Sequence, residues 1–228
     1  MGIPALLLTI FGCIFAYLIG SISPSVIISK AYFKNDVRQH YSKNAGATNT
    51  SRVLGVKTGF IVLVLDGLKI GLVLGIIKLF TLINNDLNQT SIYVSSIFAV
   101  VGHCFPIYHK FKGGKGVGPF LGFALFLNPI YFIIASAIWW TTFLLIRFVS
   151  LASLLCALGT FAFTWIMPLN DLPVNMWINH QELSFTYLIL GYWTQVIVGI
   201  IVIIVWVRHY QNIYRLLIGK EKRYQIRK

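Results

Sequence analysis

A glycine- and lysine-rich segment at residues 102–120, GHCFPIYHKFKGGKGVGPF, has the residue types of a phosphate-binding loop. Its adjacent glycines, Gly113 and Gly114, can expose backbone N–H groups to an anion, while Lys112 and Lys115 supply compact cations. The apolar segment that follows predicts a helix whose positive N-terminal dipole points at the loop. The sequence contains neither a nucleotide P-loop nor a dinucleotide fingerprint. The alternative interpretation is a flexible basic turn that touches anionic lipid headgroups.

A second polar segment, NDVRQHYSKNAGATNTSR at residues 35–52, is rich in small and hydrogen-bonding side chains. It offers neutral donors, a guanidinium that can grip a phosphate through two bonds, and a glycine that lets the backbone approach a ligand. The candidate substrate contacts in it are Ser42, Asn44, Gly46, Thr48, Asn49 and Arg52. The alternative is a solvated loop whose Asn and Ser side chains cap a short helix.

Two shorter motifs carry weaker signals. Ser150 and Ser153 lie in SLASL at an expected helix start, where a serine most often caps the helix. His209 and Asn212 are three residues apart in RHYQNIYRLLIG and would share one helical face just below the membrane. A basic helix at that place is also typical of a lipid anchor, so the pattern alone does not assign a function.

Several other chemistries are disfavoured by the sequence. It has no GxSxG elbow, no HExxH helix and no His-x4-Asp acyltransferase signature, and it contains only six acidic residues. The three cysteines lie in apolar stretches without CxxC spacing, which predicts neither a disulfide framework nor a metal site. We therefore expect no metal, no cofactor and no carboxylate-driven mechanism.

The elements that must position these residues are membrane helices. Hydrophobic residues make up 57% of the 228 residues and charged residues only 11%, whereas a soluble domain carries about 25% charged residues. We predict an all-α integral membrane protein in which residues 1–228 form a single domain. The net charge of +13 lies in short segments between apolar runs, which disfavours nucleic acid as a partner.

The same charges predict the topology. Lysines and arginines gather near 30–58, near 108–117 and in the tail 208–228, whereas the loops 84–91 and 169–183 contain none. By the positive-inside rule the basic segments are cytoplasmic. We expect the N-terminus outside and the C-terminus in the cytoplasm, with the first apolar run a membrane span and not a cleaved signal peptide.

The apolar runs predict a bundle of about seven transmembrane helices, near 3–28, 59–83, 91–107, 117–130, 131–148, 151–168 and 184–207. Asn128 and Pro129 supply the break within the long run 117–148, because the residue before proline is pushed out of helical geometry. Asp66 and Lys69, three apart in the second span, are interpreted as a structural ion pair that faces the bundle interior and positions the adjacent loop.

Taken together, these motifs resemble the bacterial membrane glycerol-3-phosphate acyltransferases that use acyl phosphate, the PlsY family. The resemblance covers nearly the whole chain. It rests on GSIS at 20–23, DVR with NAGATN and Arg52 at 36–52, Asp66 with Lys69, GHCFPIY with FKGGKGV at 102–117, SLASL at 150–154 and RHYQNIYRLL at 208–217. It implies transfer of an acyl chain from acyl phosphate to the 1-hydroxyl of glycerol 3-phosphate, giving lysophosphatidic acid and phosphate without a covalent acyl-enzyme.

The resemblance also implies a location and residue roles. The active site would lie at the cytoplasmic face of the bacterial inner membrane, and the partners would be acyl phosphate, glycerol 3-phosphate and membrane lipid. We expect the protein to act as a monomer. Carried over by position, the catalytic residues would be Ser42, Lys115, His209 and Asn212. The substrate-binding residues would be Arg52, Asn44, Gly46, Thr48, Asn49, Lys112, Gly113, Gly114, Ser150 and Ser153.

Two departures from the family pattern stand in this sequence. The usual Gly-Ser-Gly-Asn is here Tyr41, Ser42, Lys43 and Asn44, and the usual proline after Gly-Ser-Ile is Ser23, with proline one residue later. If Tyr41 or Lys43 needs a positive φ, the loop has to differ from that of the family.

Two other functional classes compete with this interpretation. A membrane transporter of a phosphorylated solute would place substrate-binding polar groups near the membrane midplane and on both sides. A non-catalytic scaffold has no need of a double-glycine lysine loop. The polar motifs here collect on one predicted face, which favours the enzyme.

Overall fold

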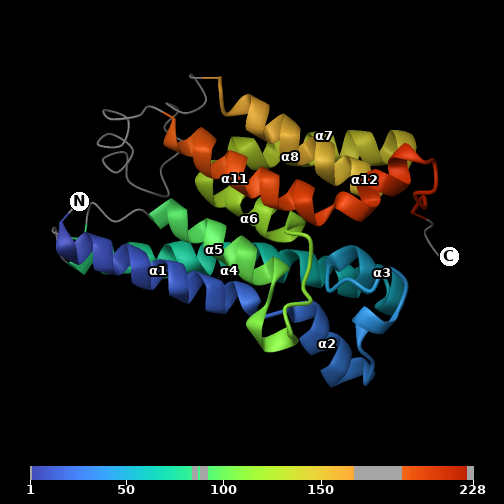
Figure 1. Cartoon of the computed structure of the whole chain (residues 1–228), viewed down its shortest axis with the longest axis horizontal. Coiled ribbons are helices and arrows are strands. Elements are labelled where there is room, and N and C mark those ends of the chain that lie inside the picture. The colour runs from blue at the N-terminus through green and yellow to red at the C-terminus, as the bar shows by residue number, and fades with distance from the viewer. Residues whose placement is uncertain (1, 84–86, 88–91, 167–191, 225–228) are drawn as a thin grey trace.

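The computed structural model describes residues 2–83, 87, 92–166 and 192–224, and the regular structure in these ranges is helical, without a strand. Two short 3-10 turns are η1 (Val37–Gln39) and η3 (Ile107–His109). The helices are α1 (Ile3–Ser21), α2 (Pro24–Phe33), α3 (Ala47–Leu54), α4 (Val56–Ile83), α5 (Ile92–Cys104), α6 (Val117–Leu127), α7 (Pro129–Ile146), α8 (Val149–Phe163), α11 (Trp193–Arg208) and α12 (Tyr210–Leu217). Figure 1 shows α1 starting at one end of the molecule, with α2, α3 and α12 at the other.

The long helices have the length and composition of membrane spans. Within the described residues, four segments qualify: Ile3–Phe33, Val56–Ile83, Ile92–His109 and Pro129–Ile146. A fifth would be α11 with α12, a pair bent by 61° at a short break. Helices α6 and α8 are apolar but shorter than the about 20 residues that a straight span needs. The structure thus agrees with an all-α membrane protein, while the number of seven spans and the sidedness of the termini stay predictions.

The break predicted at Asn128 and Pro129 is confirmed. Asn128 has an extended backbone, with φ −160° and ψ 120°, and separates α6 from α7. Its side-chain oxygen accepts the N–H of Ile130 at 2.8 Å, so it also caps the second helix. Pro129 occupies the first helical position, where its missing N–H costs nothing.

The first predicted span, near 3–28, lies within the candidate span Ile3–Phe33, but the structure divides it into two helices. The chain leaves helical geometry at Ile22 and Ser23, and α2 begins at Pro24. Ser23 caps α2 by accepting the N–H of Val26 at 3.5 Å. The shifted proline of this sequence therefore starts a helix in the ordinary way. Of the last predicted span, 184–207, residues 184–191 lie outside the described part of the chain, and the helix continues one residue further to Arg208.

Small residues bring the helices around the loops close together. A Cβ on Gly20 of α1 would lie 2.2 Å from the carbonyl oxygen of Ala99 in α5, and one on Gly122 of α6 would lie 2.3 Å from that of Gly67 in α4. Such close backbone contacts are typical of helix packing in membranes, where small residues form the interfaces. Helices α5 and α6, which flank the 102–120 motif, are thereby held against α1 and α4.

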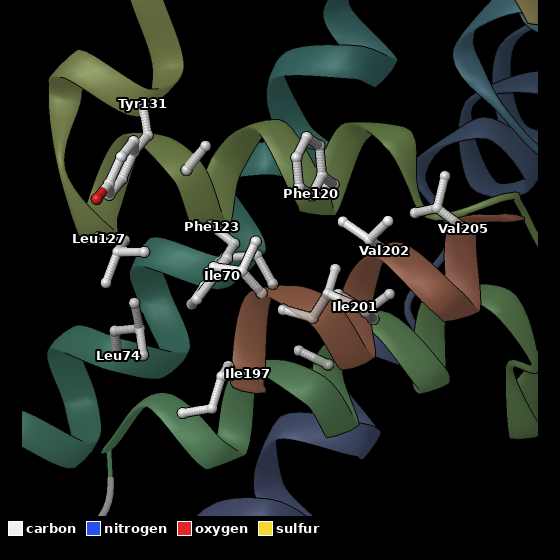
Figure 2. Packing of buried hydrophobic residues seen from close by; sticks show 14 of the residues in the cluster. Ile70, Leu74, Phe120, Phe123, Leu127, Tyr131, Ile197, Ile201, Val202 and Val205 are labelled. Atoms are coloured by element: carbon white, nitrogen blue, oxygen red, sulfur yellow. The ribbon is translucent and has the colours of Figure 1, made fainter. Parts of the chain in front are cut away.

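An apolar core joins α6 to α4 and α11. Figure 2 shows Phe120 and Phe123 of α6 in one cluster with Ile70 of α4 and Ile201 of α11. All four side chains are at most 1% exposed. This packing holds α11, which leads to the C-terminal motif, beside the helix that follows the 102–120 loop.

The predicted ion pair is present and belongs to a larger buried network. Lys69 Nζ lies 2.7 Å from Asp66 Oδ1, and His103 Nδ1 lies 3.2 Å from the same oxygen. Lys69 also donates to the carbonyl oxygens of Gly20 and Ile22, at 3.2 and 2.9 Å, where α1 ends. A charge pair inside the bilayer is tolerated when its groups satisfy one another in this way. The network joins the end of α1 to α4 and to the last turn of α5.

Candidate functional site

Residues 105–116, which we call the glycine–lysine loop, connect α5 to α6. Lys110 and Phe111 have left-handed backbone conformations, with φ of 56° and 57°, and Gly116 has φ of 87°. The N–H of Phe111 donates to the carbonyl of Pro106 at 2.9 Å, which closes a tight turn. The loop is therefore a compact, strained structure and not the flexible basic turn of the alternative interpretation.

The double glycine is required by packing as well as by any ligand. A Cβ on Gly114 would lie 2.0 Å from Nε2 of His103, and one on Gly113 would lie 2.1 Å from the carbonyl oxygen of His103. The N–H of Gly114 donates to that carbonyl at 3.0 Å. His103 thus links the loop to Asp66, a connection that the sequence analysis did not predict.

Lys115 turns away from solvent into a chain of polar contacts. Its Nζ donates to Oδ1 of Asn212 in α12 at 2.5 Å, and Nδ2 of Asn212 donates to Oε1 of Glu221 at 2.6 Å. The same Glu221 oxygen accepts the hydroxyl of Ser150 at 2.7 Å, and its other oxygen accepts Nε of Arg215 at 2.7 Å. Two predicted site residues, Asn212 and Ser150, therefore meet at one carboxylate, and Lys115 is joined to it through Asn212.

Glu221 was missed by the sequence analysis. It is the only carboxylate among the seven cations of the tail 208–228, and this contrast is the one signal that could have indicated it. Burial opposes its ionisation, but hydrogen bonds from Ser150, Arg215 and Asn212 outweigh that effect and hold its pKa below the ordinary value. Glu221 is thus a fixed negative charge that orients Asn212 and, through it, Lys115.

Replacing Glu221 by Gln should destabilise the protein by about 1.5–3 kcal/mol, the range for hydrogen bonds to charged groups. The amide cannot balance the charge of Arg215, and its NH2 group would face the NH2 group of Asn212. Thermal unfolding in detergent measures the effect, with Lys222→Gln as the matched exposed neighbour. Equal unfolding temperatures for the two variants would contradict the role given to Glu221.

His209 lies in the bend between α11 and α12 and is only 3% exposed. Its Nδ1 lies 2.7 Å from the carbonyl oxygen of Val205, so Nδ1 carries the proton that donates to it. In the neutral ring Nε2 is then the free acceptor. Asn212, one turn further along, faces the site as predicted from the spacing of these two residues.

The loop before α3 is tied together by internal bonds. Arg38 and Asp36 form a two-pronged pair, with Nη2 to Oδ2 at 2.8 Å and Nε to Oδ1 at 3.0 Å. The Arg38 side chain holds the pKa of Asp36 at about 2. Asn49, predicted as a substrate contact, is only 1% exposed, and its amide accepts the N–H of Ser42 and donates to the carbonyl of Val37. Its placement therefore supports a role in shaping the loop.

Tyr41 and Lys43, which replace the glycines of the family pattern, both adopt positive φ, of 46° and 53°. A left-handed conformation costs an ordinary residue roughly 1–2 kcal/mol. Both positions thus have the positive φ that the sequence analysis considered, and these residues keep a glycine-like backbone at a cost. Ser42 lies exposed between them.

Arg52 of α3 points toward the C-terminal tail. Its guanidinium lies 5.7 Å from the ring centre of Tyr224, and the hydroxyl of Tyr224 lies 2.6 Å from Oγ of Ser51. The N–H of Tyr224 donates to the carbonyl of Arg147 at 2.8 Å. The charge of Arg52 also lies near enough to Lys115 to lower its pKa. The tail, a segment to which the sequence assigned only positive charge, thereby borders the site.

The remaining predicted residues divide into two groups. Asn44, Gly46 and Thr48 lie partly exposed at the start of α3, where Gly46 is the N-cap. Ser153 is buried, donates to the carbonyl of Val149 at 2.8 Å and accepts Nε1 of Trp139, so it serves packing. Lys112 is exposed.

No three His, Cys, Asp or Glu side chains gather to hold a metal ion anywhere in the described residues. The chemistry that the site offers is that of cations, amides and free backbone N–H groups. Groups of these types are the ones that proteins use to bind anions, phosphate in particular.

Comparison with known proteins identifies the family of this chain. The family model for glycerol-3-phosphate acyltransferase matches residues 10–219. A glycerol-3-phosphate acyltransferase of Macrococcus caseolyticus is 36% identical over 93% of this chain and 95% of its own length. One from Mycoplasma mycoides is 43% identical over 74% of this chain, and the chain spans 66% of its length.

Solved structures agree with the sequence matches. The crystal structure of PlsY, an integral membrane glycerol 3-phosphate acyltransferase, in its glycerol 3-phosphate form superposes with a TM-score of 0.75 and 31% identity over 95% of this chain and 96% of that one. Its lysophosphatidic acid form gives 0.71 and 30%, over 96% of both chains. The all-α membrane fold is thereby confirmed. The chain belongs to the glycerol-3-phosphate acyltransferase family.

Proposed function

We propose that this protein transfers an acyl chain from acyl phosphate to the 1-hydroxyl of glycerol 3-phosphate, releasing lysophosphatidic acid and phosphate. The observation that carries the proposal is the contact of Lys115 with Asn212, beside a glycine loop and at the end of the bundle where α3 and α12 lie. Both substrates are anionic, and this end of the molecule gathers the cations and N–H groups that would bind them.

The mechanism needs little covalent chemistry from the protein. An acyl phosphate is a mixed anhydride, so its carbonyl is already activated for attack by the glycerol hydroxyl. The hydroxyl oxygen forms the new ester bond, the bond to the phosphate oxygen breaks, and the hydroxyl proton leaves with the phosphate. Lys115 and Arg52 would hold the two anions together despite their repulsion, and the loop N–H groups would stabilise the departing phosphate.

Two groups can accept the hydroxyl proton: a phosphoryl oxygen of the donor, or Nε2 of His209. We propose the substrate-assisted route, in which His209 binds and orients, because the leaving phosphate gains basicity as the bond breaks. His209→Gln should then lower turnover modestly and raise KM. An inactive His209→Gln variant with unchanged KM would instead assign the proton transfer to His209.

The donor assay tests the proposed function. Purified protein in detergent or lipid mesophase receives glycerol 3-phosphate with either palmitoyl phosphate or palmitoyl-CoA, and lysophosphatidate is measured. We expect product from palmitoyl phosphate alone. Product from palmitoyl-CoA alone would mean that the acyl donor is a thioester and not acyl phosphate. No product from either donor, in a folded sample, would contradict the proposal that the protein is an acyltransferase.

The reaction should fail at alkaline pH. Burial lowers the pKa of Lys115 to about 8, and neighbouring arginines act in the same direction. The lysine is therefore charged below pH 8 and loses its charge above it, so kcat/KM should fall about tenfold per pH unit beyond that point. Lys115→Arg, whose side chain stays charged, should remove this alkaline fall. A fall that persists in Lys115→Arg would assign it to another group.

We further propose the topology of the sequence analysis: seven spans, the N-terminus outside, and the site at the cytoplasmic face of the bacterial inner membrane, with the protein acting as a monomer. The placement of α2, α3, the glycine–lysine loop and α12 at one end supports a single-sided site. The buried Asp66 and Lys69 do not favour the transporter alternative, because they pair with each other and Lys69 donates to the end of α1. Lys57→Cys and Lys222→Cys, each made as a separate variant, test which side of the membrane these residues face. In inverted vesicles the cytoplasmic face is outside, so a thiol reagent that cannot cross the membrane should label both cysteines from outside.

A further inference from the structure

Two arginines outside the predicted site hold the backbone of the glycine–lysine loop. Arg208, at the end of α11, donates Nε and Nη2 to the carbonyl oxygen of Gly114 at 3.2 and 3.1 Å. Its guanidinium also lies 4.8 Å from the ring centre of Phe105, where the loop begins. One side chain therefore joins the start of the loop to its second glycine.

Arg38 holds the other half of the loop. Its Nη1 donates to the carbonyl oxygen of His109 at 3.0 Å and, at a longer 3.4 Å, to that of Lys112. These carbonyls flank Lys110 and Phe111, the two residues with left-handed conformations. A strained turn persists only when its surroundings hold it, and Arg38, itself fixed by Asp36, supplies that support.

The bonds to the carbonyls determine where the N–H groups point. A peptide unit is planar and trans, so its C=O and N–H point in opposite directions. The Gly114 carbonyl shares a peptide unit with the N–H of Lys115, and the Lys112 carbonyl shares one with the N–H of Gly113. Within the described residues, neither N–H has a backbone acceptor. Each guanidinium thus fixes an N–H that points away from it and, within the described residues, has no backbone acceptor.

We infer that Arg208 and Arg38 are positioning residues that direct the Lys115 and Gly113 N–H groups toward the phosphate of a bound substrate. Neither arginine need touch the ligand, because each acts through the carbonyl of the peptide that it holds. This inference rests on the proposed function. It adds an explanation of which side chains hold the phosphate-binding loop in shape. The shared ligand chemistry is a phosphate monoester, carried by glycerol 3-phosphate and by the acyl donor alike.

The test compares Arg208→Gln and Arg38→Gln with Arg223→Gln, which removes the same charge from an exposed tail residue that stacks on Phe148. We expect the two loop variants to raise KM roughly tenfold to a hundredfold, the loss expected for hydrogen bonds to a charged group. Turnover should change less, because N–H groups that bind phosphate act on the ground state as well. The substrate whose KM rises is the one that the loop binds.

Two readouts separate positioning from a general loss of structure. Arg208→Lys should recover part of the affinity, because an ammonium still reaches the Gly114 carbonyl. Arg208→Gln should also move the alkaline fall of kcat/KM to higher pH, since the Arg208 charge lowers the pKa of Lys115. Arg223→Gln should leave the profile in place.

The outcomes are distinct. If the unmodified protein is active and both loop variants keep its KM, the inference is wrong. If the unmodified protein makes no product, the proposed function fails, and binding of inorganic phosphate, followed by 31P NMR, still tests the loop. Binding that survives in Arg208→Gln and Arg38→Gln as it does in Arg223→Gln would then overturn the inference. If the Gln variants do not fold, the same comparison is made with Arg208→Lys and Arg38→Lys.

Discussion

Lys115→Ala should lower the rate of lysophosphatidate formation at least about a hundredfold, the loss typical of removing one preorganised donor from a reaction centre. Lys115 is the loop cation that turns inward, donating to Asn212 at 2.5 Å, whereas Lys110 and Lys112 are exposed. Its charge is the one placed to bridge two anionic substrates. The measurement is initial rate against the concentration of each substrate.

The matched control for this variant is Lys110→Gln, which removes a cation from the same loop without touching Asn212. It should keep most of the activity, because the Lys110 side chain is exposed and lies outside the chain of contacts around Glu221. Equal losses in the two variants would mean that the loop acts only through its overall charge. Lys115→Arg should retain activity in part, since the guanidinium keeps the charge but not the shape.

Asp66→Asn should destabilise the protein by about 3–5 kcal/mol, a larger loss than that expected for Glu221→Gln. The carboxylate is 2% exposed and pairs with both Lys69 and His103. Its removal leaves the ammonium of Lys69 buried without a counter-ion, which costs more than the pair contributes. Thermal unfolding in detergent would show the loss directly.

The double variant Asp66→Leu with Lys69→Met should recover part of that stability, because no buried charge is left unpaired. The recovery should be incomplete, since Lys69 also donates to the carbonyls of Gly20 and Ile22. Lys57→Met, an exposed cation at the start of the same helix, serves as the control. If the loss of stability in the double variant equals the sum of the losses in the two single variants, Asp66 and Lys69 are not coupled.

Much of the fold could be predicted because it depends on local pattern. Apolar runs predict membrane helices whatever their partners, and Asn128 before Pro129 breaks a helix through a clash within its own backbone. Asp66 and Lys69 pair because three residues on a helix bring them to one face, and both then face the interior. The glycine–lysine loop was likewise found from composition alone.

The helix ends were predicted less well, for a related reason. The run from 3 to 28 is apolar throughout, so hydropathy gives no sign of the break before Pro24. That break is stabilised by Lys69, which lies 47 residues from Ile22 in sequence and donates to its carbonyl. The local sequence did contain a signal, because Ser23 before Pro24 is a helix cap followed by proline at the first helical position, as Asn128 before Pro129 is.

The family resemblance indicated the reaction, the substrates and a set of candidate residues. It did not indicate which of these residues face a ligand and which hold the backbone. Asn49 and Ser153 have residue types that can bind a ligand, yet their polar atoms bind the backbone carbonyls of Val37 and Val149. Whether such a side chain faces a ligand or its own backbone depends on burial, which only the packed chain determines.

The sequence by itself therefore determined the membrane class, the helix break at Asn128, the ion pair in α4 and the position of the glycine–lysine loop, all of which follow from neighbours along the chain. Only the tertiary structure brought Glu221 to Asn212 and Ser150, and Arg38 and Arg208 to the carbonyls of the loop. Apart from the contact between Asn212 and Glu221, which are nine residues apart, these contacts join segments that are distant in sequence. They form only when η1, α5, α6, α8, α11 and α12 are packed, because a polar group's partner inside a folded protein depends on which helices pack around it.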